Sequence, residues 1–356
     1  MRDGWVRWPP RVAVERPLAR GLLFCVEFVY CIIFSDRSIN LGGIDICVKA
    51  RRGLRRRKPP IWTRLEGKDD MHLYRTSQGL ARNDGDGLLL LDLPYPDVAA
   101  LFKAGLECAL TAPVRARTTF DEVDLLAPVD KPCRVVVVGL NYRAHAAETG
   151  AEIPAEPTFF CVDGGPVVGP GDPIILPPAA PDYVDYEGEV GVVIGRAAYN
   201  VPVEDAWNFV GGLTCANDVS ARDLQAAALS EAGSAGLGFS KAMDTFKPIG
   251  PAVVTTDSFS LPLDIGLTTT VNGEIQQQCR TTDLIFDVPT LVSAVSRMVT
   301  LLPGDLICTG TPSGVGAAAG RFLTPGDVVE IEVEGIGTLS NRVVAYHSIG
   351  DPVAAP

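Results

Sequence analysis

Three acidic residues define the chemistry that this chain could perform. Glu187 and Glu189 lie two positions apart in the stretch DYEGEVGVVIG, and Asp218 follows in CANDVSARDLQ. Side chains two apart on a strand point to the same face, so the two glutamates share one surface. Two like charges about 4 Å apart repel by roughly 4 kcal/mol at an effective dielectric constant near 20, and a third carboxylate would require a bound cation or protons. A divalent cation would resolve this conflict.

The composition favours a hard cation over zinc. The chain has only three histidines, and its nine cysteines form no CxxC pair, which argues against a nitrogen and sulfur site. Mg²⁺ prefers a few carboxylates together with waters, and those waters leave positions that a substrate can take. A structural interpretation competes: the glutamates could lie on a solvated strand edge, and Asp218 could cap a helix over residues 220–225.

Further side chains could move protons or bind an anion. His145 and Glu148 are three apart in YRAHAAE, which places them on one face of an expected helix. A carboxylate that orients an imidazole gives a general base, although a lone histidine on such a helix is more often a surface residue. Lys241 could stabilise an enolate, or it could simply be solvated. The stretch TGTPSGVG offers hydroxyls and backbone amides for a carboxylate, and it lacks the Gly-Lys-Ser/Thr ending of a phosphate loop.

The elements that must position these residues are mainly strands. Short apolar runs separated by glycine and proline predict strands at residues 134–140, 188–195, 209–215, 252–255, 265–271, 306–309, 328–333 and 338–344. Helices are few, and the clearest one is expected over residues 290–301. The segment GPGDPIILP is typical of a turn that leads into an edge strand.

Composition divides the chain into unequal parts. Residues 1–70 carry 15 Lys and Arg against 8 Asp and Glu, whereas the whole chain has a formal charge of −12. We expect 1–70 to be a basic leader, disordered or non-native. A secretory signal is the weaker interpretation because Glu27 interrupts the apolar run. We further expect a small N-terminal α/β domain over 71–127, a catalytic domain over 128–347 and a tail over 348–356.

The same composition restricts the partners and the location. The negative charge argues against nucleic acid or an anionic membrane as a partner of the whole molecule, and the apolar run in the leader is too short to span a bilayer. Cysteines scattered singly among apolar neighbours are typical of a cytoplasmic protein. A rival hypothesis of another class is a non-catalytic protein that binds nucleic acid through its basic leader.

The ordered motifs resemble the fumarylacetoacetate hydrolase family over about residues 134–344. The segments that carry the resemblance are, in order, NYRAHAAE, PTFF, GPGDPIILP, DYEGEVGVVIG, NDVSARDLQ, SKAMDTFKPIGP, VNGE, LLPGDLICTGTPSGVG and LTPGDVVEIEVEGIGTLSN. The resemblance implies an α+β fold that is mainly β, with a mixed β-roll catalytic domain and usually a homodimer. A lysine common shortly after the PxxF segment is missing, because Cys161 and Val162 stand there. This absence leaves the expected metal site intact. The resemblance does not carry over the substrate contacts of the family's lid, here the loop near residues 149–157 that would close over the substrate.

The resemblance also implies roles for individual residues. It assigns Mg²⁺, with Mn²⁺ or Ca²⁺ as alternatives, to Glu187, Glu189 and Asp218. It assigns catalysis to His145, Glu148 and Lys241, and substrate contacts to Arg222, Gln225 and Thr311.

The expected substrate is a small 2-oxo or β-diketo acid that chelates the metal. The first expectation is hydrolysis of a carbon–carbon bond of the acylpyruvate or fumarylacetoacetate type, in the catabolism of aromatic compounds or keto acids. Decarboxylation of oxaloacetate-like acids and isomerisation of a 2-hydroxy-dienedioate are the enzymatic alternatives on the same site.

Overall fold

The structure, a computed structural model, describes residues 71–346 with gaps at 86, 133, 164–166 and 231–237. The predicted leader over 1–70 and the tail over 348–356 lie outside the described residues. Within the described ranges, no helix is long and apolar enough to cross a membrane.

A twelve-stranded sheet carries the candidate site. Its main path runs in the order β4 (Val114–Thr118), β3 (Gly87–Leu91), β2 (Gly79–Asp84), β1 (His72–Thr76), β14 (Lys247–Thr255), β12 (Val210–Asn217), β11 (Gly188–Ile194), β17 (Leu306–Cys308), β6 (Arg134–Gly139) and β7 (Thr158–Asp163). Two short strands pair off this path, β5 (Leu125–Leu126) with β1 and β8 (Val167–Val168) with β14.

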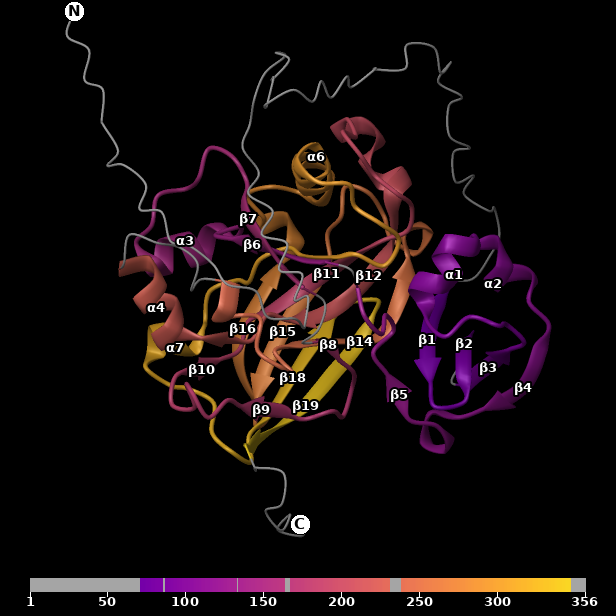
Figure 1. The fold of residues 1–356 in the computed structure, drawn as a ribbon, viewed down its shortest axis with the longest axis horizontal. Helices are drawn as coiled ribbons and strands as arrows, with labels where there is room; N and C mark the ends of the chain where they lie inside the picture. The colour runs from indigo at the N-terminus through magenta and orange to yellow at the C-terminus, as the bar shows by residue number, and fades with distance from the viewer. Residues whose placement is uncertain (1–70, 86, 133, 164–166, 231–237, 347–356) are drawn as a thin grey trace, which may run out of the picture. The chain divides into compact units, whose positions relative to one another are not determined.

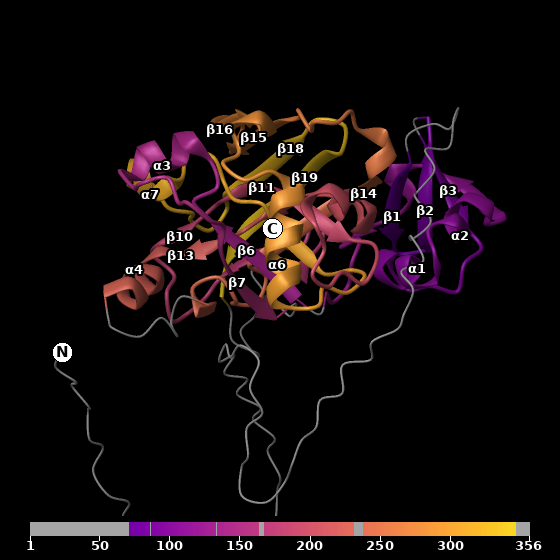
Figure 2. The same cartoon turned by 90° about the horizontal axis from the view of Figure 1, so that it is seen from above.

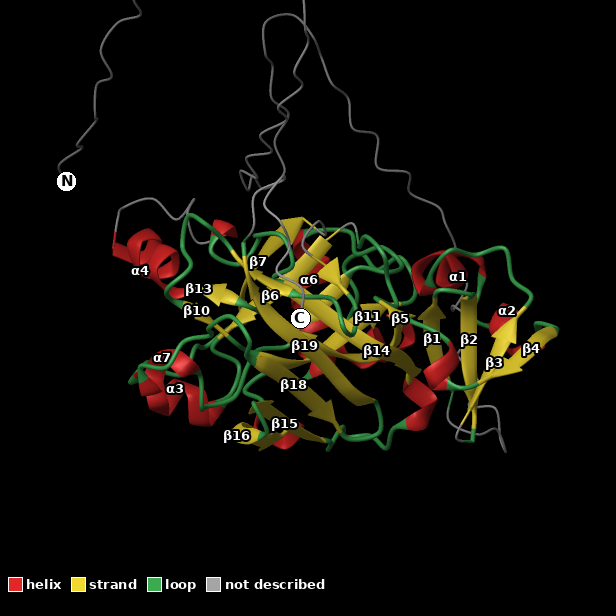
Figure 3. Cartoon of the chain, turned by 90° about the horizontal axis from the view of Figure 1, so that it is seen from below, coloured by secondary structure: helices red, strands yellow, loops and turns green. Residues whose placement is uncertain are grey.

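A five-stranded sheet forms a second layer (Figures 1 and 3). Its order is β16 (Glu274–Arg280), β15 (Gly266–Val271), β18 (Val328–Val333), β19 (Gly337–Ala345) and β9 (Ile174–Leu176). The last of these is the edge strand that GPGDPIILP predicted. A two-stranded sheet pairs β10 (Val184–Asp185) with β13 (Ser220–Ala221).

The helices are short and lie outside the sheets (Figures 1 and 2). They are α1 (Val98–Ala104), α2 (Glu107–Thr111), α3 (Arg143–Thr149), α4 (Arg222–Ser230), α6 (Val288–Met298) and α7 (Gly316–Ala319), with 3₁₀ turns η1 (Phe120–Glu122), η2 (Val203–Phe209), η3 (Thr256–Ser258) and η4 (Thr281–Asp283). The prediction of an α+β fold that is mainly β is confirmed.

Strand β11 shows why this sequence builds a sheet here. It is buried along its whole length, and its β-branched residues Val190, Val192 and Ile194 enter the apolar core between the layers, as strand alternation predicts. The second layer supplies Ile331 and Leu339 to the same core. Burying each such aliphatic side chain stabilises the fold by roughly 1.5–3 kcal/mol.

Helix α6 closes this core, and its cap explains its start. The Asp287 carboxylate accepts a hydrogen bond from the Thr290 amide at 3.0 Å, and proline follows in the first turn. Leu291 and Val295 are buried in the core. The helix therefore begins two residues before the predicted start at 290 and ends at Met298.

The N-terminal segment continues the large sheet. Strand β1 pairs with β14, so that His72 lies opposite Val254. Asp97 caps helix α1 by accepting from the Ala100 amide at 2.8 Å. The division into domains near residue 128 remains a prediction.

Candidate active site

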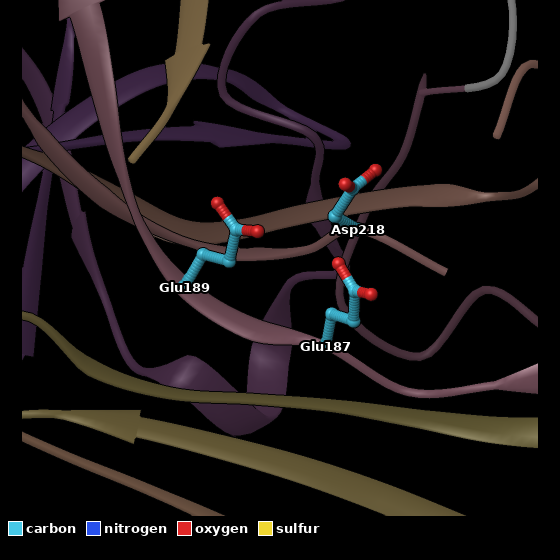
Figure 4. A group of neighbouring side chains, drawn as sticks. All are labelled: Glu187, Glu189 and Asp218. Carbon is cyan, nitrogen blue, oxygen red and sulfur yellow. The ribbon is translucent and has the colours of Figure 1, made fainter. Parts of the chain in front are cut away.

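Strand register brings the three predicted ligands together. Antiparallel pairing of β11 with β12 places Gly188 opposite Asn217. Glu187 therefore lies opposite Asp218, and the Asp218 amide donates to the Glu187 carbonyl at 2.9 Å. One oxygen from each of Glu187, Glu189 and Asp218 lies within 4.8 Å of the others, and all three residues are buried. Figure 4 shows the carboxylates around a common space.

Buried cations neutralise two of these carboxylates. Lys241 Nζ lies 2.7 Å from Glu187 Oε2 and 2.5 Å from Asp218 Oδ2. Lys247 Nζ lies 2.7 Å from Asp218 Oδ1, and Arg222 Nη1 lies 2.7 Å from Glu187 Oε1. Burial alone would raise the pKa of Glu187, but the charges of Lys241 and Arg222 outweigh it and lower that pKa to about 2. Glu187 is therefore ionised.

Among the residues that the structure describes, Glu189 forms no ion pair with a Lys or Arg. Its Oε2 accepts from the Gly310 amide at 2.7 Å, while its Oε1 is buried without a hydrogen-bond partner in the described part of the chain. Burial, followed by the charges of Asp218 and Glu187, raises the pKa of Glu189 well above its usual value. A buried carboxylate oxygen left free beside two other carboxylates is the observation expected of a ligand to a hard divalent cation. The donor set therefore fits such an ion.

A histidine and glutamate pair lies beside this cluster. His145 Nδ1 is 2.9 Å from Glu148 Oε2 on helix α3, and Glu148 Oε1 accepts from the Gly314 amide at 2.8 Å. The loop that holds Glu148 also reaches the carboxylates, because the Gly310 amide donates to Glu189, and the charge of a protonated His145 lowers the pKa of Glu187. Because Nδ1 is bound to Glu148, Nε2 is the nitrogen left for proton transfer.

Arg222 presents an unused donor. Its Nε donates to Asp185 Oδ2 at 2.8 Å and its Nη1 to Gln225 Oε1 at 2.9 Å, in addition to the ion pair with Glu187. Its Nη2 is buried and has no hydrogen-bond partner among the described residues. The guanidinium is therefore held through Nε and Nη1, and Nη2 is the nitrogen left to donate to an anion.

The Thr311 hydroxyl bonds to two neighbouring strands. It donates to the Gly188 carbonyl at 3.0 Å and accepts from Gln277 Nε2 at 2.8 Å. The first bond ties the TGTPSGVG loop to the start of β11, and the second ties it to β16. The predicted contact of Thr311 with substrate remains a prediction.

Asp218 does not cap a helix. Helix α4 begins at Arg222, after the short strand β13, and the Asp218 side chain is held by two lysines instead. The alternative interpretation of Asp218 as a cap for residues 220–225 is therefore wrong.

The sequence interpretation missed three buried residues that support the site: Asp185, Lys247 and Gln277. Asp185 accepts from Arg222 and from the backbone amides of Gly316 and Ala317 at 2.8 and 3.0 Å. It precedes Glu187 by two residues, so the alternation DxExE was an available signal. No local signal distinguished Lys247 or Gln277 from solvated residues.

Comparison with known proteins identifies the family of this chain. Residues 134–344 match the family model described as fumarylacetoacetate (FAA) hydrolase C-terminal, and the chain belongs to this family. It is 40% identical over 284 residues to the mitochondrial oxaloacetate tautomerase FAHD2A of Bos taurus, covering 77% of this chain and 89% of that protein. The resemblance inferred from the motifs is therefore confirmed.

Solved structures extend the comparison. The 2-hydroxyhepta-2,4-diene-1,7-dioate isomerase of Mycobacterium marinum has a TM-score of 0.64 and 35% identity, covering 79% of this chain and 100% of that one. The maleylpyruvate hydrolase of Sphingobium sp. SYK-6, in complex with manganese(II) and pyruvate, has a TM-score of 0.63 and 30% identity, covering 78% and 100%. Together with the carboxylate cluster, the manganese of that neighbour supports a divalent-metal site in this chain.

Proposed function

We propose that this protein is a divalent-metal-dependent enzyme that interconverts the keto and enol forms of an oxaloacetate-type 2-oxo acid. The observation that carries the proposal is the His145 and Glu148 pair beside the buried triad of oxygen ligands. Similarity to an oxaloacetate tautomerase supports the choice of reaction. We propose Mg²⁺ as the resident ion, with Mn²⁺ or Ca²⁺ as substitutes.

The charge of the site supports an anionic substrate. Four buried carboxylates, those of Asp185, Glu187, Glu189 and Asp218, face three cations, those of Arg222, Lys241 and Lys247. A bound divalent cation would turn the formal balance positive and would polarise the carbonyl of a 2-oxo acid as a Lewis acid. The free Nη2 of Arg222 would donate to a carboxylate of the same substrate.

The proton transfer follows from the orientation of His145. Its Nε2 would take a proton from the carbon next to the carbonyl, and Glu148 would stabilise the resulting imidazolium through Nδ1. Lys241 uses two of its three ammonium hydrogens on Glu187 and Asp218, and the third would donate to the enolate oxygen. The imidazolium would then return the proton to oxygen, which gives the enol.

Hydrolysis of an acylpyruvate is the second candidate. The manganese-bound maleylpyruvate hydrolase is the observation that favours it. In this reaction His145 would take a proton from water, whose oxygen attacks the distal carbonyl. The carbon–carbon bond between that carbonyl and the methylene of the pyruvate unit would then break, which releases a carboxylic acid and a pyruvate enolate that takes the proton back from His145. Decarboxylation and 2-hydroxy-dienedioate isomerisation use the same substrate contacts. A homodimer and a cytoplasmic location remain predictions.

A substrate panel tests the proposal. The purified chain is assayed with the enol of oxaloacetate, an acylpyruvate, maleylpyruvate and a 2-hydroxy-dienedioate, each with Mg²⁺, with Mn²⁺ and with excess chelator. We expect metal-dependent tautomerisation of oxaloacetate that is lost in Glu187→Gln. The matched control is Glu204→Gln, because Glu204 is an exposed glutamate of η2. Turnover that persists in chelator or in Glu187→Gln would contradict the metal mechanism, and cleavage of an acylpyruvate without tautomerisation would favour the second candidate.

A further inference from the structure

One buried amide side chain joins the two halves of the candidate site. Gln277 lies on β16, and only 1% of it is exposed although its neighbours Ile275 and Gln278 are exposed. Its Oε1 accepts from the Gly188 amide at 2.9 Å. Its Nε2 donates to Thr311 Oγ1 at 2.8 Å and to the Pro312 carbonyl at 3.0 Å. The strand of metal ligands and the TGTPSGVG loop therefore meet at one amide group.

The donors and acceptors of this network are fully assigned. Both hydrogens of the Gln277 amide nitrogen are used, and Thr311 uses its own hydrogen on the Gly188 carbonyl at 3.0 Å. A carboxylate at position 277 could not donate to Thr311 or Pro312, and an aliphatic side chain would leave the Gly188 amide unpaired in the interior. Only an amide satisfies all three of these groups, the Gly188 amide, the Thr311 hydroxyl and the Pro312 carbonyl.

The network connects the residues proposed to bind the metal with the residues proposed to move the proton. Gly188 stands between Glu187 and Glu189, two of the three residues proposed to bind the cation. The loop continues from Thr311 to Gly314, whose amide donates to Glu148, the partner of His145. A side chain at Gly314 would meet the backbone of β16, so the loop packs directly on the strand that carries Gln277.

We propose that Gln277 is a positioning residue that fixes the loop holding Glu148 against the strand of the metal ligands. The inference rests on the proposed function, because the position of this loop sets the distance between the proposed base, His145 with Glu148, and the metal site. Glu187 and Asp218 keep their ion pairs with Arg222, Lys241 and Lys247, which lie outside the loop, and Gly310, which donates to Glu189, precedes the part of the loop that Gln277 binds. Loss of Gln277 should therefore impair proton transfer and leave the affinity for metal in place.

A double-mutant cycle tests this role. Gln277→Leu and Thr311→Val each break the shared network, and we expect each to lower kcat by as much as on the order of 10²-fold, the cost of a displacement near 1 Å. The double variant should be no slower than the more impaired single variant, because both remove the same coupling. Thr311→Ser keeps the hydroxyl and should restore kcat. The control Gln278→Leu changes the exposed neighbour of Gln277 and should keep the wild-type kcat. Multiplying effects in the double variant, or an unchanged kcat in Gln277→Leu, would overturn the proposal.

Two measurements do not depend on turnover. Hydrogen exchange of residues 311–316 should be faster in Gln277→Leu than in Gln278→Leu, and the Kd for Mn²⁺ should be the same in both. If no substrate of the panel is turned over, the proposed function fails, and hydrogen exchange alone decides the role of Gln277. Unchanged exchange at residues 311–316 would then refute it. If Gln277→Leu does not fold, Thr311→Val is measured against Thr311→Ser in the same way.

Discussion

Replacing Lys247 by methionine should destabilise the metal-free protein by about 3 kcal/mol. Lys247 is 1% exposed, its Nζ lies 2.7 Å from Asp218 Oδ1, and it also donates to the carbonyls of Phe246, at 3.0 Å, and of Lys241. Breaking a buried ion pair by removing one partner costs roughly 3–5 kcal/mol. Asp218 keeps Lys241 on its other oxygen, so we expect the lower end of that range.

The assay is urea unfolding in excess chelator and again with saturating Mn²⁺. Bound ion stabilises the folded state by RT ln(1 + [L]/Kd), about 2.7 kcal/mol at a hundredfold excess over Kd. Because the ion supplies the positive charge that Lys247 provided, Mn²⁺ should stabilise Lys247→Met more than the wild type. The control is Lys103→Met, at an exposed lysine of α1, which should change the free energy of unfolding by less than about 0.5 kcal/mol. A loss below about 1 kcal/mol in chelator, or an equal gain from Mn²⁺ in variant and wild type, would refute the reasoning.

Three other predictions concern the ion, the base and the anion contact. The raised pKa of Glu189 means that a proton must leave before a cation binds, so the affinity for Mn²⁺ measured by calorimetry should increase with pH; a flat profile would contradict this. His145→Asn and Glu148→Gln should each lower kcat by about 10²–10⁴-fold in steady-state assays, with the Kd for Mn²⁺ unchanged; near-normal turnover in either would exclude the pair as the base. Arg222→Lys loses the free Nη2, and loss of a charge-assisted hydrogen bond of about 1.5–3 kcal/mol should raise KM for the oxo acid by at least about tenfold; an unchanged KM would place the substrate elsewhere.

Sequence reasoning succeeded where the signal is local. The alternation of Glu187 and Glu189 follows from the period of a strand, and the spacing of His145 and Glu148 follows from the period of a helix. Strand β16 was not predicted, because its sequence EIQQQCR has little apolar alternation. Its pairing with β15 fixes it instead. Local polarity therefore concealed the strand that carries Gln277.

The rest of the site depends on contacts between distant segments. Lys247 precedes a proline in FKPIGP, and only the pairing of β14 with β12 brings it beside Asp218. Gln277 is 89 residues from Gly188, and nothing in QQQ distinguishes it from Gln276 and Gln278 until the second sheet packs on the first. Tertiary packing decided the environment of both side chains.

The pairing of Gly188 with Asn217 also separates what can vary in this fold from what cannot. A one-residue insertion between Glu187 and Glu189, or within β12 ahead of Asp218, would turn the following side chains to the opposite face and separate the three ligands. His145 and Arg222 lie on helices outside that ladder, so the segments that carry them can change in length without shifting its register. Substrate range can therefore diverge among descendants of one ancestor while the ion-binding frame is inherited unchanged.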